Sequence, residues 1–274
     1  KPLERLAREG YEVTLLSPDS TGAISVDAVR EALREDTALV TLMMVNNETG
    51  AVTDIAGIAR TLRAAKSKAL LHTDAVQGFM KEPFSAKTLG ADMISVSGHK
   101  VHAPKGIGAL YIRQGLKLPA HILGGGQEEG LRSGTEPMPQ IAAFGEAVRI
   151  AKAEMPEANK RMEALRAQCV QTLTDTVPGI VFLGGGSAHI LSLSLPGYRS
   201  EVLMNYLEAK GIYVSKSSAC KRGKRSHVLE AIGAPDKVID GALRVSFSRY
   251  TTAEECVSFC EALAAARKEM QTHE

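Results

Sequence analysis

The stretch Asp92-Met-Ile-Ser-Val-Ser-Gly-His-Lys100 decides the fold class of this chain. Its first part is short and apolar, with Met93, Ile94 and Val96, which is typical of a buried strand. Its last residue is a lysine, and a lysine just past the end of a buried strand can be held where water is scarce. Desolvation lowers the pKa of an ammonium group, and a neutral amine can attack a carbonyl. Lys100 is therefore a candidate nucleophile.

A second buried strand, Ala69-Leu-Leu-His-Thr-Asp74, ends in an acid. In open α/β sheets, ligands bind in the crevice outside the carboxyl ends of the strands, so we expect Asp74 and Lys100 to flank one crevice. Pyridoxal phosphate requires a lysine for its aldehyde and a carboxylate for its ring nitrogen. A single lysine is most often a solvated charge, and an acid at a strand end is often a helix cap. The pair, rather than either residue, predicts a pyridoxal phosphate site.

Several motifs extend the pattern in a fixed order. They are Asn-Asn-Glu-Thr-Gly at 46–50, HTDAVQ at 72–77, SVSGHKVHAPKGIGALYIR at 95–113, GGGQEEGLRSGTEP at 124–137 and SSAC at 217–220. Together they resemble the cysteine desulfurases of the class V aminotransferase family, and the resemblance covers essentially the whole chain. It implies the fold of the fold-type I pyridoxal-phosphate enzymes.

Strands and helices alternate in the first half of the chain, which favours a mostly parallel sheet. A long helical tract then runs from Pro139 to Thr176, and the strands predicted beyond it are 189–196, 213–217 and 243–248. We therefore expect an α/β protein with two parts. Residues 1–150 are predicted to form a partial cofactor-binding large domain, and residues 151–274 a smaller C-terminal α+β domain.

The chain opens at Lys1, in what reads as the middle of a helix, and Glu12–Ser17 then reads as a strand. In the family that the motifs resemble, a helix and strand of this kind come well into the large domain. The resemblance implies that a phosphate loop with a threonine, and a histidine that stacks on the cofactor ring, come earlier. No residue here matches either, so we expect this sequence to lack the N-terminal portion.

The resemblance also implies roles for side chains in the motifs. Asn47 is expected near the phenolic oxygen of the cofactor, and Gln77 is expected to hydrogen-bond that oxygen. Ser97 and His99 are expected at the phosphate, because hydroxyl and imidazole groups donate hydrogen bonds to phosphate oxygens. Thr135 lies in a segment that crosses to the neighbouring subunit in the family and helps to hold that subunit's phosphate. Thr135 therefore predicts a homodimer.

Cys220 and Arg244 are the candidates for substrate chemistry in the second half. Cys220 follows a predicted strand and is flanked by Lys221 and Arg222, and such a setting favours the thiolate. Arg244 lies within an apolar strand, where an unpaired charge is expensive to bury, so it predicts a ligand or an acidic partner. The resemblance implies that Arg244 grips the substrate carboxylate with its guanidinium fork, with Asn47 nearby.

The function that the resemblance implies is a sulfurtransferase reaction on L-cysteine. Lys100 is expected to bond the cofactor and move a proton at the substrate's α-carbon, and His99 is a further candidate for proton movement. Cys220 is expected to take the sulfur as a persulfide and leave L-alanine. An acceptor scaffold protein would then collect the sulfur for iron–sulfur cluster or thio-cofactor assembly.

Composition excludes several other classes. The chain has 274 residues and a net charge of +2, which gives no electrostatic case for nucleic acid or membrane binding. No apolar run reaches the roughly 18 residues of a spanning helix. The four cysteines form no paired CxxC units, so we expect neither a metal site nor a disulfide framework, and we infer a reducing, cytoplasmic compartment. Side chains interpreted as ordinary core or surface residues are Cys169, Cys256, Cys260, His102, His121, His189 and His273.

Two alternatives stay open from the sequence. A selenocysteine lyase or another class V lyase, such as a kynureninase, would share Asp74 and Lys100, although the small-residue loop around Cys220 favours sulfur. A different class of protein is a truncated, non-catalytic remnant that acts as a binding or dimerisation partner. The charged run from Lys221 to Arg225 fits a solvated loop or a patch that docks an acidic partner.

Overall fold

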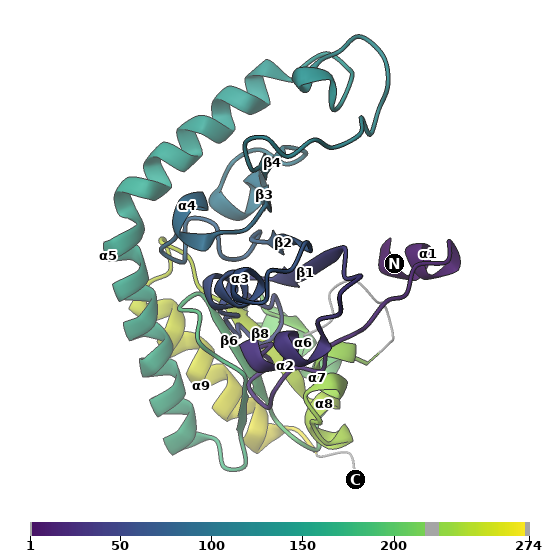
Figure 1. The fold of residues 1–274 in the computed structure, drawn as a ribbon. Helices are drawn as coiled ribbons and strands as arrows, with labels where there is room; N and C mark the ends of the chain where they lie inside the picture. Colours follow the sequence, from purple (N-terminus) through teal and green to yellow (C-terminus); the bar gives the residue numbers. More distant parts are fainter. Residues whose placement is uncertain (1, 217–224, 272–274) are drawn as a thin grey trace.

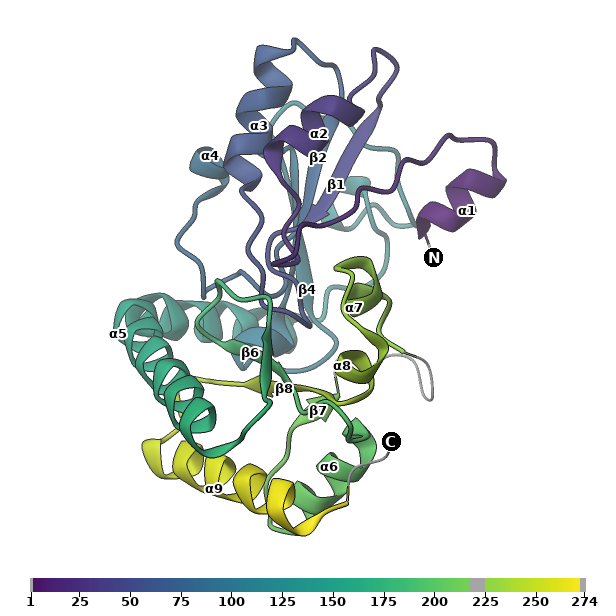
Figure 2. The same cartoon turned by 90° about the horizontal axis from the view of Figure 1, so that it is seen from below.

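The computed structural model of the chain describes residues 2–216 and 225–271. The described residues form two four-stranded sheets with helices packed against them (Figure 1). The long helix α5 (Met138–Thr176) extends from the first sheet to the second and carries the chain between them (Figure 2). An α/β fold with two different sheets is what the sequence predicts. The expected boundary at residue 150 falls within α5, so it remains a prediction.

The first sheet has the strand order β1-β2-β3-β4. β1 pairs with β2 and β2 with β3 in parallel, whereas β3 and β4 are antiparallel. The sheet is therefore mostly parallel, as the alternation of strands and helices predicts. The strands are β1 (Leu39–Met43), β2 (Leu70–Asp74), β3 (Met93–Ser97) and β4 (Gly108–Ile112).

Two helices, α2 (Val26–Ala32) and α3 (Ile55–Ala64), cover this sheet. Each begins at a capping side chain, Ser25 for α2 and Asp54 for α3, whose oxygen accepts a backbone N–H of the first turn. Apolar side chains of both helices pack on the strands. The buried core here includes Val29, Ile55, Ile58, Leu62, Leu71 and Ile94.

The second sheet has the order β5-β6-β8-β7, and all its neighbours are antiparallel. Three of its strands lie where the sequence predicts them. The fourth, β5, was not predicted, because three residues are too few to show an alternating pattern. The strands are β5 (Val181–Leu183), β6 (Ile190–Ser194), β7 (Ser215–Lys216) and β8 (Ala242–Ser246).

Helices α5 and α9 pack on the second sheet and bury its largest core. Of the remaining helices here, α8 was not predicted, because five residues give little periodicity. The helices after α5 are α6 (Ser200–Glu208), α7 (His227–Ala231), α8 (Asp236–Asp240) and α9 (Ala253–Glu269).

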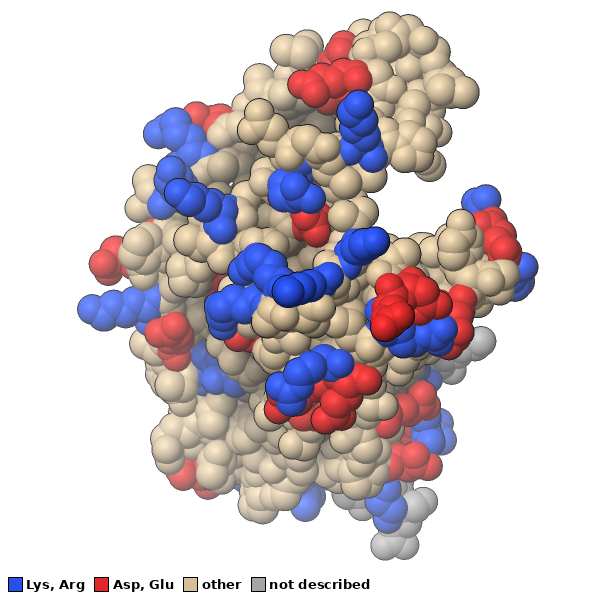
Figure 3. All heavy atoms as spheres, in the orientation of Figure 1, with Lys and Arg blue, Asp and Glu red and all other residues tan. Residues whose placement is uncertain are grey.

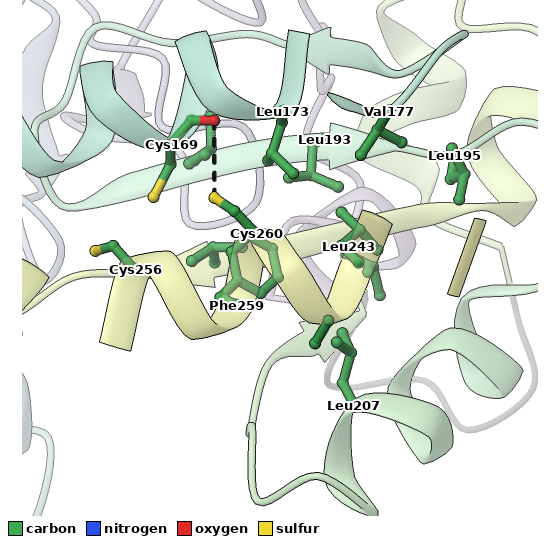
Figure 4. Packing of buried hydrophobic residues seen from close by; sticks show 14 of the residues in the cluster. Cys169, Leu173, Val177, Leu193, Leu195, Leu207, Leu243, Cys256, Phe259 and Cys260 are labelled. Carbon is green, nitrogen blue, oxygen red and sulfur yellow. Dashed lines mark hydrogen bonds between the residues drawn. The ribbon is translucent and has the colours of Figure 1, made fainter. Parts of the chain in front are cut away.

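Three cysteines belong to the core between α5 and α9 (Figure 4). Cys169, Cys256 and Cys260 are all buried, and the Cys260 thiol points to the backbone carbonyl of Cys169. Burial raises the pKa of Cys256 to about 12, so this group is a neutral thiol at ordinary pH. The interpretation of these three side chains as small hydrophobes is confirmed. No group of histidine, cysteine or acidic residues in the described ranges could hold a metal ion.

The strand predicted over Glu12–Ser17 is wrong. The described chain has no regular structure there, and Leu15 is 79% exposed. A strand needs a neighbour for its backbone hydrogen bonds, and no described strand pairs with this segment. The preceding helix α1 (Pro2–Arg8) is confirmed, but it buries none of its residues and lies apart from the sheets (Figure 1).

Two short elements lie between strands of the first sheet, the helix α4 (Ala86–Leu89) and the 3-10 turn η1 (Gly98–Val101). A second 3-10 turn, η2 (Glu128–Gly130), lies between β4 and α5. Lysine, arginine and acidic side chains are interspersed over the face of the molecule in Figure 3. Among the described helices, none is both long and apolar enough to cross a bilayer.

Candidate active site

The parallel pairing aligns the carboxyl ends of β1, β2 and β3 at one edge of the first sheet. β2 ends at Asp74, β3 ends at Ser97, and the turn of Asn46 and Asn47 follows β1. The carboxylate of Asp74 is oriented because its Oδ1 accepts the backbone N–H of Val76 at 3.0 Å. These residues therefore share one edge of the sheet. Asp74 is not among the residues that line the cavity beside Lys100, so a crevice flanked by both stays a prediction.

Lys100 lies in η1, directly after β3. The turn requires a glycine at its start, because a Cβ at Gly98 would lie 2.8 Å from Cγ2 of Ile107. Burial lowers the pKa of Lys100 below its ordinary value, and the charge of Arg244 lowers it further. The fold thus provides an amine with a raised fraction of the nucleophilic, neutral form, as the sequence predicts.

A cavity of about 180 Å³ lies beside Lys100. Its walls come from η1, from α5 and from the second sheet, so it is assembled from both halves of the chain. Its lining is strongly basic, and the polar and charged side chains in it include Gln77, Lys81, Lys100, His189, Arg244 and Arg249. Such a cavity suits a ligand that carries negative charge.

Arg244 is held in this cavity by the first sheet. It projects from β8, and its Nη1 donates a hydrogen bond to the backbone oxygen of Asn47 at 2.9 Å. The two residues are 197 positions apart in sequence. The structure therefore brings together the two positions that the resemblance implies for substrate binding.

Ser97 and His99 form a pair next to Lys100 but do not line the cavity. Ser97 Oγ and His99 Nδ1 are 2.7 Å apart. Partial burial lowers the pKa of His99, and the charges of Lys100, Lys105 and Lys81 lower it further. Their mutual hydrogen bond uses one of the two protons that a neutral imidazole and a hydroxyl carry, so the pair keeps one further hydrogen-bond donor at the end of β3.

Thr135 lies far along the chain from this group. It is exposed, in the loop between β4 and α5, and it does not line the cavity. This loop projects away from the first sheet at the top of Figure 1. Within one chain, therefore, the structure does not bring Thr135 to Lys100.

Cys220 lies outside the described residues, but the described chain on either side of residues 217–224 is anchored. Lys216 Nζ pairs with Glu201 at 2.7 Å, and Arg225 pairs with Asp240 at 3.0 Å. Ser226 donates a hydrogen bond to the Glu48 carboxylate in the turn that follows β1.

Lys81 is a site residue that the sequence reasoning missed. Its Nζ donates to the backbone oxygen of Lys100 at 2.8 Å, and Asn159 of α5 donates to the oxygen of Lys81. Burial lowers the pKa of Lys81 to about 8, with a further contribution from the charge of Lys100. No motif marked Lys81, because its role depends on a contact across 19 residues.

Because its pKa is lowered in the folded state, Lys81 binds fewer protons there than in the unfolded chain. It therefore destabilises the fold most below its folded pKa of about 8, and the loss is recovered as the pH rises toward the unfolded pKa. We expect the free energy of unfolding to gain about 2 kcal/mol from this group between about pH 7 and about pH 9.5. Urea denaturation should show this gain in the native chain and a flatter profile in Lys81→Met. Lys87→Met, at an exposed lysine of α4, should keep the native profile; equal profiles for all three chains would contradict the assignment.

His189, Glu154 and Arg249 were also missed as cavity residues. His189 is buried and hydrogen-bonds Gln77, so its interpretation as an ordinary side chain overlooked its place in the site. Arg249 Nη1 lies 3.3 Å from the Glu154 carboxylate of α5. Each depends on contacts between distant segments, which no local pattern reveals.

The fold agrees closely with solved structures. The described chain superposes on a NifS-like protein with a TM-score of 0.91 at 36% identity, covering 98% of this chain and 71% of that one. It also matches DndA from Streptomyces lividans with a TM-score of 0.75 at 38% identity, covering 90% and 71%. With a carboxylate at the end of β2 and a lysine directly after β3, this is the fold of the fold-type I pyridoxal-phosphate enzymes.

The chain belongs to the class-V aminotransferase family, whose model matches residues 1–259. It is 42% identical over 257 residues to cysteine desulfurase 2 of Trichormus variabilis, covering 92% of this chain and 64% of that protein. It is 43% identical over 258 residues to the cysteine desulfurase IscS of Tolumonas auensis, covering 91% and 62%. The chain thus spans less than two thirds of the length of these relatives, and the resemblance inferred from its motifs is confirmed.

Proposed function

We propose that this chain carries the active site of a pyridoxal-phosphate-dependent cysteine desulfurase. The reaction removes sulfur from L-cysteine and leaves L-alanine and a persulfide, which we assign to Cys220. The observation that carries the proposal is that Lys100 and Arg244 line one cavity, with Arg244 held there by Asn47. Similarity to proteins named cysteine desulfurase supports sulfur rather than another class V reaction.

The described residues fit pyridoxal phosphate. Asp74 offers a carboxylate for the ring nitrogen, Lys100 an amine of lowered pKa for the aldehyde, and Ser97 and His99 hydrogen-bond donors for the phosphate. Gln77 faces the same cavity and offers an amide. When bound, the cofactor would withdraw electrons from the substrate's α-carbon.

Residues of the chain itself bind the substrate, move the proton and receive the sulfur. Arg244 holds the substrate carboxylate with its planar fork. Lys100 moves a proton at the α-carbon, and His99 is positioned one residue away to assist. The Cys220 thiolate forms a bond to the substrate sulfur as the carbon–sulfur bond breaks, and the proton needed to complete alanine is delivered by Lys100.

The partners follow from the same proposal. The persulfide needs a sulfur-acceptor scaffold protein, which would serve iron–sulfur cluster or thio-cofactor assembly. Thr135 is exposed and distant from its own chain's Lys100, which supports a homodimer in which it reaches the neighbouring subunit's phosphate. A reducing cytoplasmic compartment suits a chemistry that depends on a free thiol.

The direct experiment is to add pyridoxal phosphate to the purified chain and to follow the absorbance spectrum and the substrate turnover. We expect a spectral change on binding, and turnover of L-cysteine above that of L-selenocysteine and kynurenine. A chain that prefers kynurenine would be another class V lyase. A chain that binds no cofactor would fit a non-catalytic binding partner.

Arg244→Lys is expected to raise the KM for L-cysteine by roughly 10- to 100-fold, because lysine keeps the charge but loses the two-point fork. The dissociation constant of L-alanine should rise in parallel. Arg267→Lys is the matched control, since Arg267 contacts Tyr198 in the second half of the chain, outside the cavity. An unchanged KM in Arg244→Lys would remove Arg244 from the substrate site.

A further inference from the structure

Three buried polar side chains form a chain of hydrogen bonds that ends at the cavity. Ser187, His189 and Gln77 are 1%, 4% and 7% exposed. Ser187 Oγ hydrogen-bonds His189 Nδ1, and His189 Nε2 lies 3.3 Å from Gln77 Oε1. Both His189 and Gln77 line the cavity beside Lys100, although 112 residues separate them.

The donor and the acceptor of each hydrogen bond in this series follow from elementary chemistry. An amide oxygen can only accept, so His189 Nε2 must carry the proton. Burial lowers the pKa of His189 to about 3, helped by the charges of Lys81, Lys100 and Arg244, so the ring is neutral at ordinary pH. A neutral imidazole has one N–H, so Nδ1 accepts and the Ser187 hydroxyl donates.

We propose that His189 is a positioning residue that, with Ser187, turns the Gln77 amide so that its N–H groups face the cavity. The carbonyl oxygen of Gln77 is occupied by the imidazole, and only donors remain for a ligand. The ligand atom opposite Gln77 is then a hydrogen-bond acceptor, and an anionic oxygen is the best match. This inference rests on the proposed function for the identity of that ligand, whose phenolic oxygen is such an acceptor.

Glu82 is the group that could exchange the donors and acceptors in the hydrogen bonds of Ser187, His189 and Gln77. Its carboxyl also hydrogen-bonds Ser187, and burial raises its pKa. If the Ser187 hydroxyl instead donated its hydrogen bond to an ionised Glu82, His189 would carry its proton on Nδ1 and donate it to Ser187 Oγ. His189 Nε2 would then accept a hydrogen bond from the Gln77 amide nitrogen, and Gln77 would present its oxygen to the cavity. The protonated nitrogen of His189 therefore reports which end of the amide faces the ligand.

The first test is the tautomer of His189 in the purified chain, read from its ring nitrogens by long-range proton–nitrogen NMR. We expect a neutral ring protonated on Nε2 near pH 7. A ring protonated on Nδ1, or a charged ring, would overturn the proposal. This measurement needs no cofactor, so it decides the role of His189 even if the proposed function fails.

The second test uses variants and the dissociation constant of pyridoxal phosphate. His189→Leu removes the donor and should weaken binding roughly tenfold, the upper end of one hydrogen bond. His189→Gln places an amide N–H near the position of Nε2 and should recover most of the affinity. Ser187→Ala should weaken binding, whereas Ser192→Ala should not, because no described residue hydrogen-bonds the buried Ser192 hydroxyl.

Different outcomes would contradict the positioning role of His189 and the proposed function. Equal affinities for His189→Leu and the native chain, with both folded by circular dichroism, would overturn the positioning role. Failure of borohydride to fix the cofactor on Lys100 of the native chain would contradict the proposed function. The tautomer would then still show how Gln77 is oriented.

Discussion

Lys100→Ala is expected to abolish the turnover of L-cysteine, with a loss on the order of 10³-fold or more. In the proposed function, Lys100 supplies both the amine that bonds the cofactor aldehyde and the group that moves the proton. Its position after β3, its lowered pKa and its place in the cavity with Arg244 all support these roles. Among the described residues, Lys81 also lines the cavity with a lowered pKa, but its Nζ donates a hydrogen bond to the backbone oxygen of Lys100.

The same assignment has a direct chemical readout. Borohydride reduction of the native chain with pyridoxal phosphate, followed by peptide mapping, should place a pyridoxyl group on Lys100. The sharpest competitor is Lys81, a second amine of lowered pKa that lines the same cavity. Label on Lys81 in the native chain would show that the assignment of Lys100 is wrong. Loss of label in Lys100→Ala, with label retained in Lys87→Met, would support it.

Much of the fold could be predicted because its signals are local. The strands that end at Asp74 and Ser97 are short and rich in apolar residues, and the caps of α2 and α3 are marked by Ser25 and Asp54. A parallel sheet then brings the strand ends together as a matter of geometry. The wrong strand at Glu12–Ser17 shows the limit of local signals, because the residues of one segment cannot show whether a neighbouring strand exists to pair with it.

The candidate site was predictable only where a motif marks it. The contacts that complete it are long-range: Arg244 meets Asn47, His189 meets Gln77, and Lys81 meets Lys100. The sequence does not distinguish a buried lysine or histidine from an exposed one. The pKa of such a side chain depends on its burial and on charges from other segments. The motifs therefore mark the candidate reactive groups, but not the side chains from distant segments that contact them.

Cys220→Ala is the second change with a large expected effect. We expect the release of sulfur from L-cysteine to fall on the order of 10³-fold or more, because the nucleophile that we propose to receive the sulfur is lost. The affinity for pyridoxal phosphate should stay within about twofold, a difference of about 0.4 kcal/mol, because no residue assigned to hold the cofactor changes. Mass spectrometry of the alkylated native chain should find the persulfide on Cys220.

The other three cysteines are poorly placed to receive sulfur. Cys169, Cys256 and Cys260 lie buried between α5 and α9, and none of them lines the cavity beside Lys100. The raised pKa of Cys256, at about 12, leaves almost no thiolate to attack sulfur. Cys256→Ala is therefore the matched control: it should lower the thermal midpoint by removing a buried side chain, yet release sulfur at the native rate. Native sulfur release in Cys220→Ala, or a persulfide on one of the three buried thiols, would assign the nucleophile elsewhere and require the core between α5 and α9 to open during the reaction.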